Sequence, residues 1–182
     1  MTTQDLIDHL NRFIAPVTPF DTTDYSDPLA IDKLREQWFA TVEKEDVCRS
    51  LAEIITAQKP SEWPDREWMY YLEICQTGGL LRHSEHAYHL MNKIIPLLSD
   101  KNKRTLVIQV LGELGVEESV SYLEKLPINE LSEEQLTDLA ATVGMIGGQH
   151  SRGFLNTLKD NIYAQSPVVQ REIAIALENI DQ

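Results

Sequence analysis

Three of the five histidines in this 182-residue chain follow one another at intervals of three residues, as His83, His86 and His89. Imidazole nitrogens bind transition metals, and a zinc site in a protein takes three or four ligands. On an α-helix, neighbouring members of this series can share one ion, but His83 and His89 lie about 120° and about 9 Å apart. The spacing therefore favours solvent-exposed histidines, and a two-ligand metal site at His83 and His86 is the weaker alternative.

The helix that must carry these histidines is predicted to begin at Ser84, whose hydroxyl can accept a hydrogen bond from the first turn of the helix. Five apolar residues then recur at helical spacing and form the expected buried stripe: Ala87, Leu90, Met91, Ile94 and Leu98. At about 100° per residue, His89 points nearly opposite this stripe and His86 lies on its flank.

The composition is that of an acidic globular protein, with a formal net charge of −13, 42% hydrophobic residues and 25% charged residues. This charge disfavours binding to nucleic acid and to anionic membranes, and it suits either solubility or a basic partner. The sequence contains no run of about 18 apolar residues, so no membrane span is predicted. Cys48 and Cys75 fall in apolar helical runs and are expected to be small buried side chains. We expect a cytoplasmic protein.

Helix signals dominate the chain, and no segment has the alternating pattern of a strand. Residues 15–27 contain two prolines and six Asp or Thr residues, which predicts a linker. From residue 65 onward, seven helices separated by short breaks are predicted: 65–77, 84–98, 102–115, 117–126, 132–147, 151–163 and 167–180. Short connections between helices imply that neighbouring helices run antiparallel.

A short sequence recurs within this helical part. The stretch VLGELG at 110–115 returns 32 residues later as TVGMIG at 142–147, and more weakly 34 residues after that as ALENID at 176–181. Two helices per period of this length are typical of an α-solenoid, in which stacked helix pairs bury one continuous core. Within each copy, Gly112 and Gly144 would let a neighbouring helix approach closely. The closing glycines, Gly115 and Gly147, would end their helices in a left-handed conformation.

Together with the leucines that follow each copy, this pattern resembles the short bacterial HEAT-like repeat, of the type also found in phycobilisome bilin lyases. VLGELG is followed by Leu123 and Leu126, and TVGMIG by Leu155 and Leu158. The resemblance covers residues 65 to 182. It implies an all-α fold, an α-solenoid or α–α superhelix of HEAT-like helix pairs. We expect residues 61–182 to form this repeat domain, with residues 1–60 as an N-terminal helical extension packed on it.

The resemblance implies a non-enzymatic adaptor, scaffold or inhibitor-type protein that binds another protein along its concave face. A HEAT-like enzyme or enzyme subunit, metal-dependent or lyase-type, is the alternative. The His-Glu dipeptides of deoxyhypusine hydroxylases are missing. HEAT-like DNA glycosylases need a basic groove, whereas the basic residues Lys93, Lys101, Lys103 and Arg104 are expected to solvate a turn and the start of a helix. We predict no catalytic residue and no cofactor.

The repeat also predicts which residues would contact a partner. In the helix at 102–115, Leu106, Val107, Val110, Leu111 and Leu114 form the expected buried stripe, and Thr105, Gln109 and Gly112 lie opposite. The equivalent positions in the other copies complete the predicted binding surface: Glu73, Thr105, Gln109, Thr137, Arg171, Ile175 and Glu178. The last helix is apolar over more than half its circumference, so a homodimer through this helix is one arrangement that would cover it.

Overall fold

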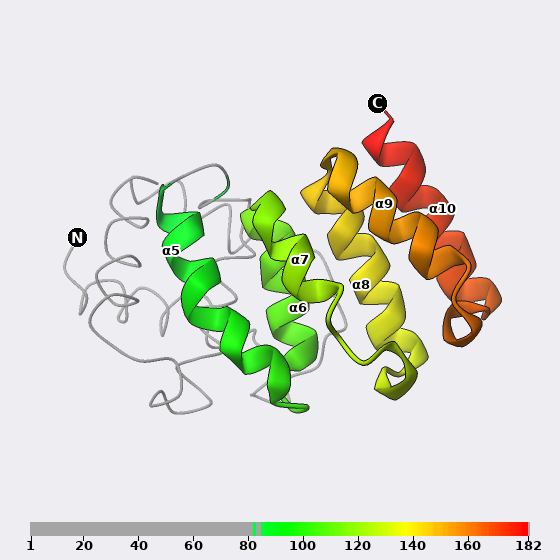
Figure 1. The fold of residues 1–182 in the computed structure, drawn as a ribbon, viewed down its shortest axis with the longest axis horizontal. Helices are drawn as coiled ribbons and strands as arrows, with labels where there is room; N and C mark the ends of the chain where they lie inside the picture. The colour runs from blue at the N-terminus through cyan, green and yellow to red at the C-terminus, as the bar shows by residue number, and fades with distance from the viewer. Residues whose placement is uncertain (1–81, 83–84, 182) are drawn as a thin grey trace, which may run out of the picture. The chain divides into compact units, whose positions relative to one another are not determined.

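The computed structural model describes Arg82 and residues 85–181, which belong to one compact unit, Leu81–Gln182. This part of the chain is helical and contains no strand, which confirms the predicted all-α class (Figure 1). Its elements, with η for 3-10 helices, are α5 (Glu85–Ile94), η3 (Ile95–Ser99), α6 (Arg104–Leu114), η4 (Glu117–Ser119), α7 (Val120–Leu123), η5 (Ile128–Glu130), α8 (Glu133–Ile146), α9 (Gly148–Lys159), η6 (Ile162–Ala164) and α10 (Pro167–Ile180). The predicted linker at 15–27, the helix at 65–77 and the boundary at residue 60 lie outside the described residues.

Three helices run side by side in one row, with α8 packed between α6 and α10. Helices α7 and α9 lie against α8 on the side that faces the viewer in Figure 1, and α9 also packs on α10. Helix α5 packs against η3 and α6. The central helix α8 therefore has α7 and α9 on one side and a neighbour of the row on each flank, whereas α6 and α10 each have one neighbour in the row among the described helices.

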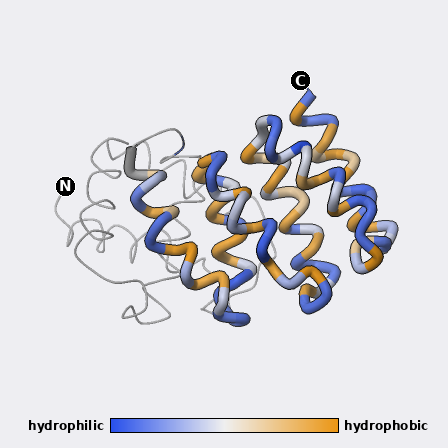
Figure 2. Tube along the Cα trace, in the orientation of Figure 1, coloured by the Kyte–Doolittle hydropathy of each residue, from blue (hydrophilic) through white to orange (hydrophobic). Residues whose placement is uncertain are grey.

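Apolar residues recur at helical spacing along these helices, as the hydropathy colours show for α5 and α6 (Figure 2). The stripe predicted for the helix at 84–98 is confirmed across α5 and η3, since each of its five members is at most 6% exposed: Ala87, Leu90, Met91, Ile94 and Leu98. In α8 the corresponding buried residues are Leu136, Leu139, Ala140 and Val143. Removal of these side chains from water is the main term that favours this packing.

Side chains at the predicted positions begin two of the helices in the row. Before α8, the Ser132 hydroxyl accepts from the Gln135 backbone N–H at 3.1 Å, and the Ser132 N–H donates to the Gln135 side chain at 3.2 Å. This reciprocal pair satisfies two backbone donors at the helix start. Before α10, Ser166 accepts from the Val169 N–H at 3.2 Å, and Pro167 takes the first helical position. The helix starts expected at 132 and 167 are therefore correct to within one residue.

Glycines end α6 and α8 in two different ways. Gly115 has φ 63° and ψ 27°, which is the predicted left-handed conformation. Gly147 also has a positive φ, 75°, but its ψ is −170°, so the left-handed helical prediction is wrong there. The difference arises because α9 begins at Gly148, which itself has φ 84°, and not at residue 151 as expected. The chain reverses direction within a single residue, and glycine accepts the positive φ values that this requires.

The internal glycines of the repeat lie where neighbouring helices meet, as predicted. A Cβ atom added to Gly112 would lie 3.3 Å from the Cα of Thr142 in α8. A Cβ added to Gly144 would lie 2.6 Å from the Cβ and 2.9 Å from the Cα of Ala176 in α10. Both glycines therefore allow a helix backbone to approach more closely than a larger residue would permit.

The basic residues around the start of α6 are not all solvated, and the expectation from sequence is wrong for Arg104. Arg104 is only 5% exposed, and its Nε donates to the Leu98 carbonyl oxygen at 2.9 Å. Lys101 is exposed and lies 3.2 Å from the Glu130 carboxylate. Lys103 lies 3.6 Å from the Asp100 carboxylate. The hydrogen bond from Arg104 links α6 to η3, and the guanidinium is buried and not on the surface.

Candidate functional site

Of the three histidines His83, His86 and His89, the structure describes only the side chain of His89. His89 is exposed, as predicted from its position on the helix. His83 lies outside the described residues, and the His86 side chain is not described. Within Arg82 and residues 85–181, no group of three His, Cys, Asp or Glu side chains is placed to hold a metal ion.

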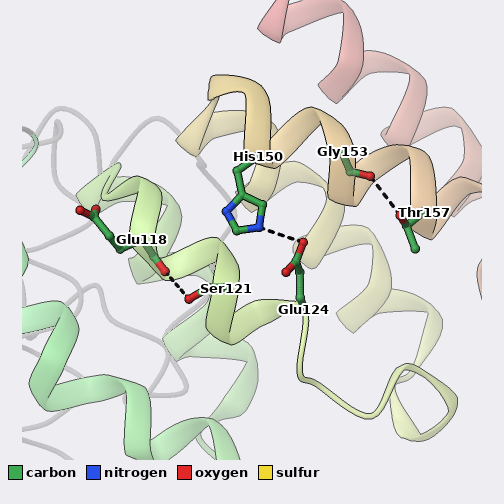
Figure 3. A network of polar contacts seen from close by, with 6 residues as sticks. All are labelled: Glu118, Ser121, Glu124, His150, Gly153 and Thr157. Atoms are coloured by element: carbon green, nitrogen blue, oxygen red, sulfur yellow. Dashed lines mark hydrogen bonds and ion pairs between the residues drawn. The ribbon is translucent and has the colours of Figure 1, made fainter.

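One histidine does lie beside a carboxylate. The His150 Nε2 of α9 is 3.1 Å from a Glu124 carboxylate oxygen at the end of α7 (Figure 3). The nearby Ser121 hydroxyl donates to the Glu118 carbonyl oxygen at 2.8 Å and not to His150. Because the hydroxyl is not held by the imidazole, these residues do not form the nucleophile and base relay that hydrolases use. We assign the His150–Glu124 pair to the contact between α7 and α9.

Two of the predicted partner-binding residues on α6 lie on the side of the helix that faces α8. The Thr105 hydroxyl accepts from the Gln135 side-chain amide at 3.0 Å. The Gln109 side-chain amide donates to Asp138 Oδ2 at 3.2 Å. With Gly112, these residues follow the boundary between the two helices, and all three are at least half-buried.

The other predicted binding residues are distributed differently. The Thr137 hydroxyl donates to the Glu133 carbonyl oxygen of its own helix at 2.9 Å. Arg171, Ile175 and Glu178 are exposed on α10. Glu73 lies outside the described residues. Partner binding by these residues stays a prediction, but their positions show that the predicted surface is not a single open row.

The predicted buried stripe of α6 needs the same correction. Leu106, expected to be buried, is half-buried, whereas Ile108 is fully buried. Gly112, expected opposite the core, is buried against α8. The reason is that α6 packs on two sides, on the core and on α8, whereas periodicity in the sequence indicates only one buried direction.

One side of helix α8 is not covered by any other helix in the part of the chain that the structure describes. Viewed down the helix at about 100° per residue, its core stripe is centred about 180° from four residues at intervals of four, three and four. We call these residues the α8 face: Glu134, Asp138, Ala141 and Met145. Thr142 faces α6 and Gly144 faces α10, on the two sides between stripe and face. Glu134 and Met145 are exposed, and Asp138 and Ala141 are half-buried.

Asp138 is the most unusual group on the α8 face. Burial raises the pKa of its carboxyl above the ordinary value for aspartate; the Gln109 hydrogen bond opposes this shift and Glu134 adds to it. Among the described residues, Asp138 forms no ion pair, and only its Oδ2 accepts a hydrogen bond. A partly buried carboxylate without a nearby cation costs stability, so the stability of the fold does not explain why aspartate occupies this position.

Replacing Asp138 with asparagine should raise the free energy of unfolding at pH 7 by less than about 1 kcal/mol, since the carboxyl is partly exposed and screened. The folded protein holds the Asp138 proton more tightly than the unfolded chain does. Stability from this group is therefore present at low pH and lost as the pH rises through its folded-state pKa. The gain from asparagine should shrink as the pH falls below about 4, because aspartate then becomes protonated in the unfolded as well as in the folded state.

Urea unfolding of both proteins at pH 7 and at low pH measures this difference. Glu118→Gln is the control, because it removes one negative charge from an exposed position off the α8 face. Equal gains for the Asp138 variant at both pH values would contradict the burial of the charge as the cause.

The outward side of α10 differs from the corresponding sides of α6 and α8. Gly112 and Gly144 pack against the next helix of the row. The equivalent position in α10, 34 residues after Gly144, is Glu178, which is exposed. Arg171 is exposed on the same helix, with Ile175 between the two charges and 39% exposed. The homodimer through α10 stays a prediction, and such a dimer would have to accommodate both charges.

No family model, no curated protein and no solved structure matches the chain. In the described part of the chain, every helix is too short or too polar to cross a bilayer. The geometry of the α8 face is therefore the basis for a functional proposal.

Proposed function

We propose that this protein is a non-enzymatic protein-interaction module, an adaptor, scaffold or inhibitor-type protein. In this proposal its helices form a short HEAT-like solenoid, and the partner lies along the row of α6, α8 and α10. The side-by-side packing of these helices and the close contacts at Gly112 and Gly144 support the solenoid.

The observation that carries the proposal is the position of Met145. Its side chain is 42% exposed, and it lies on the side of α8 that no other helix of the described part, residues 85–181, covers. Methionine is flexible and polarizable, and exposed methionines are frequent on surfaces that bind peptides. Ala141 lies one turn before it on the same side of α8, so this end of the α8 face is apolar.

Two sets of variants test the proposed surface. A photo-crosslinking amino acid at position 145 should label one partner in a lysate of the source organism. The same amino acid at Asn156, exposed on α9, should not. With the purified partner, Met145→Asp should weaken binding by at least about tenfold, since a charge would be buried at the interface. Asn156→Asp is the matched control and should change affinity by less than about twofold.

The two readouts must agree. Labelling that does not depend on position, or equal affinities for the two aspartate variants, would show that the α8 face is not the binding surface.

A further inference from the structure

We infer that the segment that binds the α8 face is a basic amphipathic protein segment, with an apolar side chain against Met145 and a lysine or arginine against Asp138. This inference rests on the proposed function and adds the chemistry of the partner. It follows from what each end of the face presents and from the distance between the two ends.

The C-terminal half of the face is apolar. Met145 is 42% exposed, and Ala141, one turn before it, presents only a methyl group. A small residue beside an exposed methionine lets a partner's apolar side chain approach the helix and pack against the thioether. Arg82 donates to the Gly112 and Met145 carbonyl oxygens, so the nearby guanidinium is directed at the ends of α6 and α8.

The N-terminal half of the face is negatively charged. Glu133 and Glu134 lie in the first turn of α8, where the helix dipole favours carboxylates. The stability of the helix therefore explains the presence of these two residues. Asp138 lies beyond that turn, is half-buried, and has no hydrogen-bond partner for Oδ1 among the described residues. Helix α8 carries no basic residue. A cation from a partner would supply the missing charge and a donor for Oδ1.

The spacing of the two ends restricts the partner further. Asp138 and Met145 are seven residues apart on one helix, which is about 10 Å along its axis. A helical partner segment therefore needs a cation and an apolar anchor about 10 Å apart, which are seven residues apart on one face of its helix.

Charge complementarity decides between the candidate occupants. A second copy of this chain brings the same net charge of −13, and nucleic acid brings phosphates; both would be repelled by Glu134 and Asp138. A basic protein segment is attracted by the same groups, and its lysine or arginine can pair with Asp138.

The test uses the full chain and three synthetic helical peptides. All three share the same leucine positions and differ only in the residue seven positions from the central leucine: lysine, glutamine or glutamate. Isothermal titration calorimetry should give an affinity for the lysine peptide at least about tenfold above that of the glutamine peptide, with the glutamate peptide weakest.

Variants of the protein locate the effect. Asp138→Asn should reduce the preference for lysine over glutamine to about threefold or less, while Met145→Asp should weaken all three peptides. Glu118→Gln, the control for net charge, should leave the preference unchanged. Equal affinity for the lysine and glutamine peptides, no binding of the lysine peptide, or equal effects of Asp138→Asn and Glu118→Gln would each overturn the inference.

The peptide results separate this inference from the proposed function. If the crosslinked partner still requires Met145 but lysine is not preferred, only the assignment of a basic segment fails. If Met145→Asp leaves both the peptides and the crosslinked partner unaffected, the binding surface itself is wrong.

Discussion

Replacing Gly144 with alanine should lower the free energy of unfolding by about 1–3 kcal/mol, as overpacked positions do, although alanine is the better helix former. The new Cβ would lie 2.6 Å from the Ala176 Cβ and 2.9 Å from the Ala176 Cα. The second of these atoms belongs to the backbone, so no rotation of a side chain relieves the contact. Helices α8 and α10 would have to move apart and lose part of their packing.

Gly153 provides the matched control for this substitution. It lies inside α9, is exposed, and a Cβ added to it would meet no atom within 4 Å. Gly153→Ala should therefore stabilise the protein by about 0.5–1 kcal/mol through helix propensity alone. Urea unfolding measures both values. A stabilising Gly144→Ala, similar to Gly153→Ala, would contradict the close approach of α8 and α10.

Replacing Arg104 with alanine should cost about 1.5–3 kcal/mol, the range for a hydrogen bond from a charged donor. The side chain is 5% exposed and donates to the Leu98 carbonyl oxygen at 2.9 Å, which holds η3 against α6. A cation at the start of a helix is unfavourable with respect to the helix dipole. The bond to Leu98 and the packing of the aliphatic stem must therefore offset that cost.

Lys101→Ala is the control in the same turn. Its side chain is 75% exposed, and its ion pair with Glu130 spans 3.2 Å. Exposed pairs of this kind contribute about 1 kcal/mol or less, so the variant should unfold almost as the natural protein does. Thermal unfolding measures the loss of stability in both variants. Similar losses for Arg104→Ala and Lys101→Ala would mean that the hydrogen bond from Arg104 does not stabilise the fold.

Much of the helical architecture could be predicted from local signals. Ser132 with Gln135, and Ser166 with Pro167, mark helix starts because they satisfy backbone donors or fix the backbone angle. Gly115 marks a helix end for a similar local reason. These signals lie within a few residues of the structure that they predict, so they do not depend on the rest of the fold.

The candidate surface could be predicted only in part, because its orientation depends on neighbouring helices. The sequence pattern of α6 indicates where the core lies, but Thr105 and Gln109 meet α8 on a side that the pattern leaves undetermined. Glu134 and Asp138 resemble other surface carboxylates in the sequence, and only the structure shows that Asp138 is partly buried and contacts Gln109. Burial of Arg104 likewise results from contact with η3, and its lysine neighbours gave no indication of it.

The most direct test of the proposed function is a titration of methyl-labelled methionine by NMR, with the partner identified by crosslinking. Of the four methionines, Met145 is 42% exposed on the α8 face and Met91 is 1% exposed in the core. Binding at the α8 face predicts that the Met145 methyl signal shifts or broadens in proportion to the bound fraction, while the Met91 signal stays in place. A Met145 signal that is unchanged at saturation would show that the partner binds elsewhere.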